Sequence, residues 1–409
     1  MRFSSVSAGQ QTLPYKPIAG DGLRFFGFLM ACLLFSFGAP AADDKVLFEQ
    51  KLEPYPFPII VSVVIAGTGY PFILDTGAGF DVLDPSLERA LGPATGSESV
   101  KTSGGNTDVK LFKAPPITMG HWTLPAGEAT LFALDGARSM LGIDLRGIVG
   151  GRAMKDCALA LDFDHGELRI FKGNVKPPAP MQTSELAIQT GGTVAIKAEM
   201  EGRGLDFVVD TGSNGYIGLA HDIYAQMVSD GTIKEEEGGG SRTETGAGAV
   251  TQPRAHFTKG HLLGVDLAGM PVSDANTLCN VGIGFLLNFD SMIDFQGAKF
   301  RYLIRQASPP LDHHAMLGLM LMYSHGRNHV FKVSSVSGAA KEAGIKVWDH
   351  IVRLGPLKGS EINEIGIYEL CLNHAGETLE VEIERPGEEQ PLLRHLTIPE
   401  TEYEYPPRK

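Results

Sequence analysis

Short runs of branched apolar residues, separated by glycine-containing turns, dominate the pattern of hydrophobic and polar positions. Residues 59–65 and 193–200 are rich in Val, Ile and Ala, and each run is followed by a Gly-X-Gly turn. Runs of this length bounded by turn residues are typical of β-strands. A helical spacing of apolar positions is brief, for example over residues 220–229. The pattern therefore predicts a mainly β protein with little helix.

This pattern repeats once along the chain. Residues 67–77 (GTGYPFILDTG) align without a gap on residues 202–212 (GRGLDFVVDTG). In each copy an apolar strand runs into Asp-Thr-Gly, and a glycine-containing apolar element follows about 75 residues later, at Gly150 and at Gly284. Each copy then closes on an apolar-Asp-Phe strand. Self-similarity of this kind indicates two tandem copies of one structural unit.

The N-terminus has the pattern of a secretory signal peptide. An apolar run from Phe25 to Phe37 follows a weakly basic stretch that ends at Arg24, and small residues follow at 39–42. The run is shorter than the roughly 20 apolar residues that a membrane span needs. We therefore expect a periplasmic or secreted protein. An uncleaved membrane anchor and a buried helix are the alternatives.

Shifts in composition divide the chain into four predicted segments. They are a signal peptide (1–41), a first β unit (46–180), a second β unit (181–309) and a C-terminal domain (312–400). The proline-rich residues 177–180 are interpreted as a stiff linker between the two β units.

Charge and composition exclude several classes of function. The 409-residue chain has a net charge of −13 and no run of Lys or Arg, so we expect no nucleic-acid partner. His313-His314 has neither an HExxH motif nor a cysteine cluster, so we predict no metal site and no cofactor. Without the signal peptide three cysteines remain, Cys157, Cys279 and Cys371. We interpret them as buried packing residues, and a disulfide between two of them stays an open alternative.

The double occurrence of Asp-Thr-Gly gives this tripeptide a chemical interpretation. One copy alone would be explained by an Asp-initiated turn. Two such turns placed face to face would bring Asp75 and Asp210 within hydrogen-bonding distance of one water molecule. Two carboxylates that close cannot both ionise, so they share a proton. The ionised group can take a proton from the water while the protonated group polarises a carbonyl, which predicts hydrolysis of a peptide bond.

The duplicated motif, with its later Ile-Val-Gly and Gly-Ile-Gly elements, resembles the retropepsin-like aspartic proteases. The resemblance covers residues 46 to about 305 and implies a pseudo-two-fold pair of retropepsin- or pepsin-like β-barrel units on one chain. It implies that Asp75 and Asp210 are the catalytic pair. The residues that it implies as supports for the two loops are Thr76, Gly77, Thr211 and Gly212.

The same family closes a hairpin flap over its substrate. The candidate flap glycines in this chain are Gly104, Gly105, Gly246 and Gly248. Glycines suit a hinged lid, and ordinary exposed loops explain them nearly as well. The first motif continues into Gly79, where the family more often has a polar residue, so substrate contacts there are open. The two copies differ considerably between motif and flap, which predicts an asymmetric cleft.

The C-terminal segment resembles a bacterial PDZ domain, most specifically in its middle. Gly318-Leu319-Met320 is similar to the carboxylate-binding loop, and residues 338–344 are similar to the short Ala-Ala helix that follows. The resemblance implies a small α/β domain that adds a peptide to its sheet edge and holds the peptide's C-terminal carboxylate. Trp348 departs from the pattern because Gly is usual there. A domain that only packs against the β units is the alternative.

Together these observations favour an aspartic endopeptidase with a peptide-binding C-terminal module. The expected partners are protein or peptide substrates and peptide C-termini, with a membrane only if the N-terminal segment is retained. A non-catalytic peptide-binding envelope protein on a protease fold is the second hypothesis. It is disfavoured because both Asp-Thr-Gly triplets are intact. A purely structural envelope protein is the third.

Overall fold

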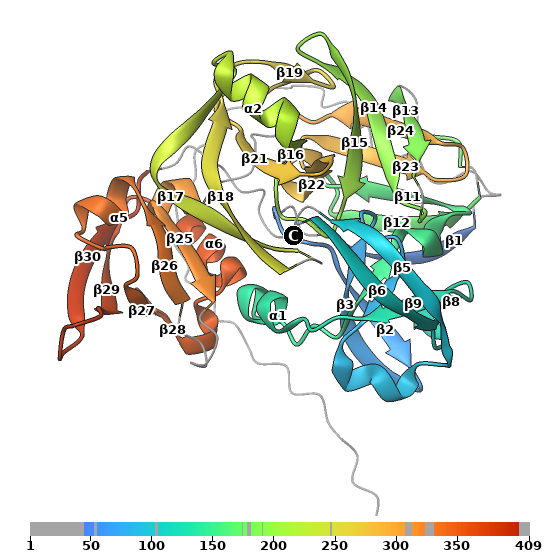
Figure 1. Ribbon diagram of the computed structural model, residues 1–409, viewed down its shortest axis with the longest axis horizontal. Coiled ribbons are helices and arrows are strands. Elements are labelled where there is room, and N and C mark those ends of the chain that lie inside the picture. Colours follow the sequence, from blue (N-terminus) through green and yellow to red (C-terminus); the bar gives the residue numbers. More distant parts are fainter. Residues whose placement is uncertain are drawn as a thin grey trace, which may run out of the picture. The chain divides into compact units, whose positions relative to one another are not determined.

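The computed structural model describes residues 45–52, 55–102, 105–173, 175–177, 181–189, 191–245, 248–306, 313–323 and 331–400. The expected signal peptide and most of the proline-rich linker lie outside these residues. Within the described ranges, no helix combines the length and apolar character needed to cross a membrane. The prediction of a mainly β fold is confirmed, and Figure 1 shows strands along most of the chain.

The strands and helices of the described residues have the following bounds. Up to residue 172 they are β1 (Val46–Lys51), β2 (Ile60–Ile65), β3 (Thr68–Asp75), β4 (Asp81–Leu83), β5 (Ala94–Thr102), β6 (Gly105–Lys113), β7 (Ile117–Met119), β8 (Trp122–Thr123), β9 (Glu128–Leu131), α1 (Asp135–Leu141), β10 (Gly147–Gly150), β11 (Cys157–Asp162) and β12 (Glu167–Lys172). From residue 182 to 304 they are β13 (Gln182–Ile188), β14 (Val194–Met200), β15 (Arg203–Asp210), β16 (Ile217–Ala220), α2 (His221–Ser229), β17 (Ile233–Thr245), β18 (Gly248–Phe257), β19 (His261–Leu262), β20 (Val265–Asp266), β21 (Pro271–Asn276), β22 (Cys279–Gly282), α3 (Ile283–Leu286), β23 (Phe289–Asp294) and β24 (Lys299–Ile304). After residue 312 they are α4 (His313–Leu317), β25 (Leu319–Tyr323), β26 (Phe331–Val336), α5 (Gly338–Glu342), β27 (His350–Leu354), β28 (Leu357–Lys358), α6 (Glu364–Asn373), β29 (Thr378–Glu384) and β30 (Leu392–Thr397).

The first Asp-Thr-Gly lies at the end of the central strand of a sheet. Strand β3 pairs antiparallel with β2 through a tight turn at Gly67, whose φ of 82° suits glycine. On its other side β3 pairs parallel with β10, so that Gly150 lies opposite Asp75. Because the apolar side chains of β2 alternate between buried and exposed, one face of the sheet packs into the core.

The second Asp-Thr-Gly has the same local architecture. Strands β14 and β15 form the matching hairpin, and β15 pairs parallel with β22. In that pairing Gly282 lies opposite Asp210. The counterpart of Gly150 is therefore Gly282, and the sequence alignment that placed Gly284 there was wrong by two residues. The apolar-Gly-x-Gly spacing allowed either glycine, and the strand register selects the first.

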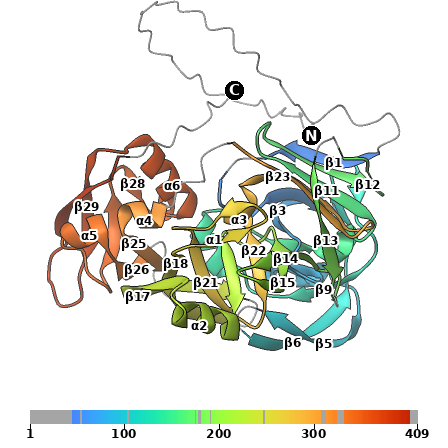
Figure 2. The same cartoon turned by 90° about the horizontal axis from the view of Figure 1, so that it is seen from above.

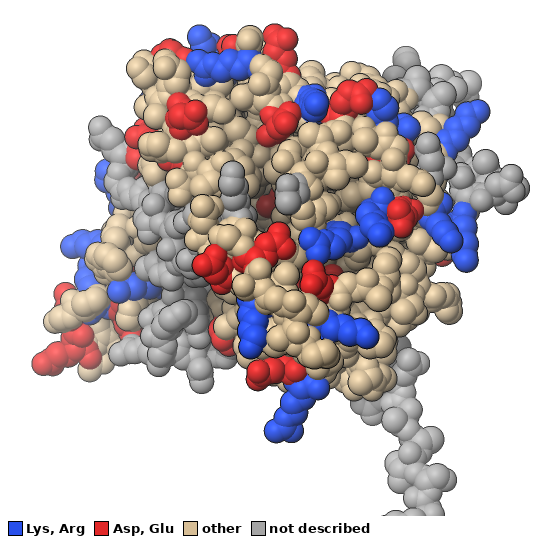
Figure 3. Space-filling view, turned by 45° about the vertical axis from the view of Figure 1, so that its right-hand side comes forward, with Lys and Arg blue, Asp and Glu red and all other residues tan. Residues whose placement is uncertain are grey.

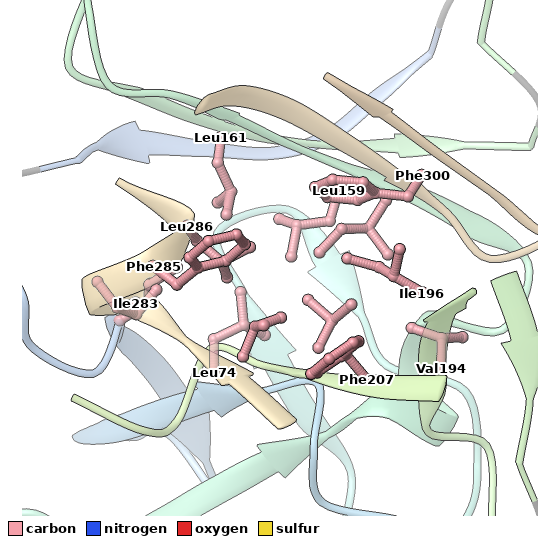
Figure 4. Close-up of a cluster of buried hydrophobic side chains, with 14 of the residues drawn as sticks. Leu74, Leu159, Leu161, Val194, Ile196, Phe207, Ile283, Phe285, Leu286 and Phe300 are labelled. Carbon is pink, nitrogen blue, oxygen red and sulfur yellow. The ribbon is translucent and has the colours of Figure 1, made fainter. Parts of the chain in front are cut away.

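Strands from the two copies join at the base of the β body. Strand β11 pairs antiparallel with β23, so that Leu159 lies opposite Ile293 (Figure 2). These are the apolar-Asp-Phe strands that end the two sequence repeats. Leu74 and Phe207 are fully buried, and Figure 4 shows side chains from both copies directed toward one another. These side chains belong to one hydrophobic cluster, so the two copies share one core. Burial of each such side chain contributes about 1.5–3 kcal/mol.

The residues from 313 to 400 have a separate hydrophobic core beneath their strands. Its largest side chain is the fully buried Tyr368 of α6, and Tyr55 and Phe57 pack against it at ring-centroid distances of 5.1 and 5.5 Å. Trp348 has a φ of 77°, which is the conformation that glycine usually supplies at this position. Its ring is 53% exposed and lies 4.1 Å from the Lys332 ammonium group, a cation–π contact.

Charged side chains of both signs are mixed on the surface. On the face shown in Figure 3, Lys and Arg side chains alternate with Asp and Glu side chains. Surface ion pairs such as Arg254–Glu236 and Arg353–Glu380 reflect this mixing.

Candidate active site

Asp75 and Asp210 each emerge from the last position of a buried strand, where the parallel neighbour contributes a glycine. A Cβ at Gly150 would lie 2.5 Å from the carbonyl oxygen of Phe80, and a Cβ at Gly282 would lie 2.3 Å from that of Gly215. Neither backbone neighbour can retreat cheaply. The glycines are therefore required for the loops that follow the two aspartates to pack against the parallel strands.

The two Asp-Thr-Gly loops meet face to face. A Cβ built on Gly77 would lie 2.8 Å from Asp210 Cγ, and a Cβ built on Gly212 would lie 2.4 Å from Asp75 Cγ. Each carboxyl group thus lies directly over the glycine of the opposite loop. Any larger residue at these two positions would displace a carboxyl group. The structure brings together the pair of aspartates that the sequence repeat singled out.

Thr76 and Thr211 hold the two loops together with a reciprocal set of hydrogen bonds. The Thr76 N–H donates to Thr211 Oγ1 at 3.1 Å, and the Thr76 hydroxyl donates to the Val209 carbonyl at 2.5 Å. In return the Thr211 N–H donates to Thr76 Oγ1 at 3.2 Å, and the Thr211 hydroxyl donates to the Leu74 carbonyl at 2.6 Å. Both side chains are fully buried, so these bonds fix the loops relative to each other.

The environment of the two carboxyl groups separates their proton affinities. Desolvation by burial raises the pKa of Asp75 well above its ordinary value, and the adjacent Asp210 raises it further. Hydrogen bonds from the N–H groups of Gly77 and Ala78 lower this pKa and offset part of the rise. Burial also raises the pKa of Asp210, but hydrogen bonds from Asp75 and Asn280 oppose that rise. Burial thus raises the pKa of both carboxyl groups, and the neighbouring Asp210 adds to the rise for Asp75.

Asn280 makes the site asymmetric, and the sequence analysis missed it. Its Nδ2 lies 3.4 Å from Asp210 Oδ2, whereas the corresponding position in the first copy is the apolar Ile148. A polar residue inside an otherwise apolar strand was the available signal. The two carboxyl groups therefore have different surroundings, and the asymmetry of the cleft stays a prediction.

Asp81 and Arg152 lie beside the first loop. Asp81 Oδ1 accepts a hydrogen bond from the Gly150 N–H at 3.0 Å, and burial raises the Asp81 pKa to about 6. The Arg152 guanidinium lies 5.3 Å from the centre of the Phe80 ring and donates to Glu128 at 3.2 Å. These contacts anchor β10 and the segment after it, which is why a buried aspartate is tolerated there.

Two of the four candidate flap glycines, Gly105 and Gly248, lie at the ends of long hairpins. Gly104 and Gly246 fall outside the described residues. Gly105 pairs with Thr102 at the end of the β5–β6 hairpin, and Gly248 pairs with Thr245 at the end of the β17–β18 hairpin. The role of these hairpins as flaps stays a prediction.

Each of the two hairpins has a break in its register, which in β5–β6 lies between Ala94 and Gly96. Strand β17 breaks register with β18 between Glu235 and Gly240, and Gly239 pairs with Ser335 of β26. Residues 235–240 thus belong to strand β17, and the side chain of Glu235 is exposed there.

The proposed carboxylate-binding segment runs from Gly318, which separates α4 from β25, into the first two residues of β25. Gly318 has a φ of 67°, and a Cβ there would lie 2.0 Å from the Ser337 carbonyl oxygen, so glycine is required. Leu319 is buried and Met320 is half-buried. The helix α6, which the sequence marked poorly, begins after the cap residue Asn363, whose side chain accepts from the Gly366 N–H at 2.9 Å.

The described residues contain three buried cysteines and one possible set of metal ligands. Cys157, Cys279 and Cys371 are buried, and none of them forms a disulfide with another described residue. Among the described residues, one group has the composition and spacing of a metal site, formed by His313, His314 and Glu364. The histidine pair that the sequence showed without companions therefore has a carboxylate beside it.

Comparison with known proteins gives one family match. The family model described as "Aspartyl protease" matches residues 61–145, which run from β2 through the first Asp-Thr-Gly to the residues just before β10. No curated protein matches the chain. The match supports aspartic protease activity in general, and so a hydrolase that acts on proteins or peptides.

Proposed function

We propose that this chain is an aspartic endopeptidase in which Asp75 and Asp210 form the catalytic dyad. The observation that carries the proposal is the placement of each carboxyl group over the glycine of the opposite loop, at 2.8 and 2.4 Å from a Cβ built there. The reciprocal threonine bonds give the rigidity that such a site needs. In this proposal both tandem units supply one carboxyl group to a single site.

The unequal carboxyl groups suggest a division of roles in the reaction. The ionised Asp210 accepts a proton from a bound water, whose oxygen attacks the peptide carbonyl carbon. The protonated Asp75 donates its proton to the carbonyl oxygen, giving a neutral tetrahedral diol. Transfer of the proton now held by Asp210 to the amide nitrogen allows the C–N bond to break. A proton returns from the diol to Asp75, and the dyad regains its starting charge.

The direct test is cleavage of a denatured protein mixture by the mature chain between pH 3 and 8, with and without pepstatin. New peptide termini, mapped by mass spectrometry, are the expected result. A folded preparation that yields none at any pH would contradict the proposal and would favour the peptide-binding hypothesis.

Replacing Asn280 by the near-isosteric Leu should move the acidic limb of the pH–rate profile toward higher pH. The amide of Asn280 stabilises the ionised form of Asp210 and so lowers its pKa. Without it, Asp210 holds its proton to higher pH, and a higher pH is needed to reach full activity. The measurement is kcat/KM against pH. Asn288→Leu, whose amide bonds to the Phe285 carbonyl instead, is the control and should leave the profile unchanged.

We further propose that residues 312–400 bind peptide C-termini at Gly318-Leu319-Met320. The left-handed Gly318 and the strand β25 that follows it support this proposal, because such a loop can direct N–H groups at a carboxylate. Fluorescent peptides with a free C-terminus should bind the full chain at least about ten-fold more tightly than the same peptides with an amidated C-terminus. Equal affinities of the two forms would argue for a domain that only packs.

Export through the N-terminal segment is also a proposal, based on the apolar run from Phe25 to Phe37 and the small residues after it. Sequencing the N-terminus of the protein from its native host should start at Ala42. A chain that starts at Met1 would instead indicate a retained segment.

A further inference from the structure

Three potential metal ligands from two distant parts of the chain converge beneath β25. His313 and His314 begin α4, and Glu364 begins α6. The two imidazoles and the carboxylate offer ligand atoms that all lie within 4.8 Å of one another. His313 Nε2 lies 2.8 Å and His314 Nε2 lies 3.0 Å from the same oxygen, Glu364 Oε2. Donor atoms about 3 Å apart suit a cation with metal–ligand bonds of about 2.0–2.1 Å.

The Nε2 atom of His314 faces this carboxylate, because its Nδ1 atom faces a backbone carbonyl. Its Nδ1 lies 3.1 Å from the Leu319 carbonyl oxygen, which can only accept, so Nδ1 carries the proton. In the neutral ring Nε2 is then a bare lone pair, 3.0 Å from a carboxylate oxygen. Two lone pairs at that distance repel each other unless a cation or a second proton lies between them. A backbone carbonyl that holds the outer nitrogen is the usual support of a metal-binding histidine.

Burial makes this requirement stronger. The side chains of His313 and Glu364 are 5% and 7% exposed, and that of His314 is 20% exposed. Glu364 lies beside the apolar core that contains Tyr368, whose ring is 5.6 Å from His313. A buried carboxylate is costly unless it is paired or coordinates a metal ion. The partial exposure of His314 leaves a path by which an ion and a water ligand could enter.

We propose that His313, His314 and Glu364 bind one divalent cation of the zinc class, with water as a further ligand. Two imidazoles and one carboxylate are a ligand set that zinc accepts. Metal ions that prefer thiolate ligands only, or oxygen ligands only, do not fit this set. The ion would tie the start of α4 to the start of α6, which are 51 residues apart in the sequence. This inference does not depend on the proposed protease activity.

The test uses the full mature chain stripped with EDTA and then dialysed against Zn²⁺, with bound metal measured by mass spectrometry. The wild type should retain one Zn²⁺ that Glu364→Gln and His314→Gln bind at least about 100-fold more weakly. His374→Gln is the matched control, because His374 ends the same helix and pairs with Glu377 at 2.8 Å on the surface. This variant should bind zinc as the wild type does.

A second measurement does not rely on the variants folding. Substitution with Co²⁺ should give the wild-type chain visible absorption bands typical of a four- or five-coordinate site, and one equivalent of Zn²⁺ should remove them. Circular dichroism checks the fold of each variant. A wild-type chain that binds no zinc or cobalt, or folded Glu364→Gln and His314→Gln chains that bind zinc as tightly as the wild type, would overturn the proposal. The cluster would then be a proton-linked ion pair only.

Discussion

Replacing either Asp75 or Asp210 by Asn is expected to lower kcat/KM for peptide cleavage by at least about 10³-fold while the chain stays folded. The proposed reaction needs one ionised and one protonated carboxyl group, and an amide can be neither. Asn keeps the shape of the side chain, and its carbonyl oxygen can still accept the Gly77 N–H, which lies 2.7 Å from Asp75 Oδ1. The measurement is cleavage of a peptide found in the mapping experiment, at the optimal pH.

The matched control is Asp206→Asn. Asp206 lies on the same strand as Asp210 but is exposed, so this change removes a carboxylate from β15 without touching the site. Its activity should equal that of the wild type. Cleavage that survives in both Asp75→Asn and Asp210→Asn would rule out the dyad.

Stability gives an independent readout of the same substitution. Because the pKa of Asp75 is raised in the folded chain, its contribution to stability is fully present below the pKa of the unfolded chain and is lost as pH rises through the folded value. Asn does not ionise, so its effect on stability does not change with pH. Asp75→Asn should therefore melt at a higher temperature than the wild type at pH 7, and the difference should shrink as pH falls. A variant that melts well below the wild type at pH 7 would show that ionisation of the Asp75 carboxyl group does not destabilise the folded chain.

Replacing Thr211 by the near-isosteric Val is expected to lower the free energy of unfolding by about 2–6 kcal/mol, because two buried backbone groups lose their partners at about 1–3 kcal/mol each. The Leu74 carbonyl loses the hydroxyl at 2.6 Å, and the Thr76 N–H loses its acceptor at 3.1 Å. The same change loosens the two loops, and small misplacements of catalytic groups cost about 10²-fold in rate. Denaturant unfolding followed by the fluorescence of Trp122, which is 9% exposed, measures the first effect.

The control for Thr211 is Thr130→Val. Thr130 is also buried, at 6% exposure, but its hydroxyl makes one bond, to the Lys110 carbonyl at 2.9 Å. Loss of this hydrogen bond should lower the free energy of unfolding by about 1 kcal/mol and leave the rate of peptide cleavage unchanged. Equal losses of stability and activity in the two variants would argue that the reciprocal bonds between the loops have no special role.

The features that sequence alone could predict are those set by neighbouring residues. The alternation of apolar residues before Gly67 and Gly202 predicted the two hairpins, and the helix expected over residues 220–229 is α2 (His221–Ser229). The aspartates at the ends of β3 and β15 were found because a repeat is visible in the sequence itself. Successive side chains of a strand point to opposite faces of the sheet, so the buried positions follow a period of two that is visible in the sequence.

The features that sequence could not predict depend on register and on packing between distant residues. Gly282 rather than Gly284 lies opposite Asp210, because strand β22 pairs in one register of the two that the glycines allow. Asn280 reaches Asp210 only across that pairing, over a separation of 70 residues. A shift of one residue would turn its side chain to the other face of the sheet.

The chain by itself therefore determined which residues carry chemistry, and the tertiary structure decided which of them act on one another. Asp75, Asp210 and the pair His313-His314 are visible as residue types in a pattern. That the pKa of Asp75 is raised well above its ordinary value and that Glu364 lies beside the two histidines follow from desolvation and from contacts between separate elements. Those quantities depend on distance and burial in three dimensions, which no local pattern of residues specifies.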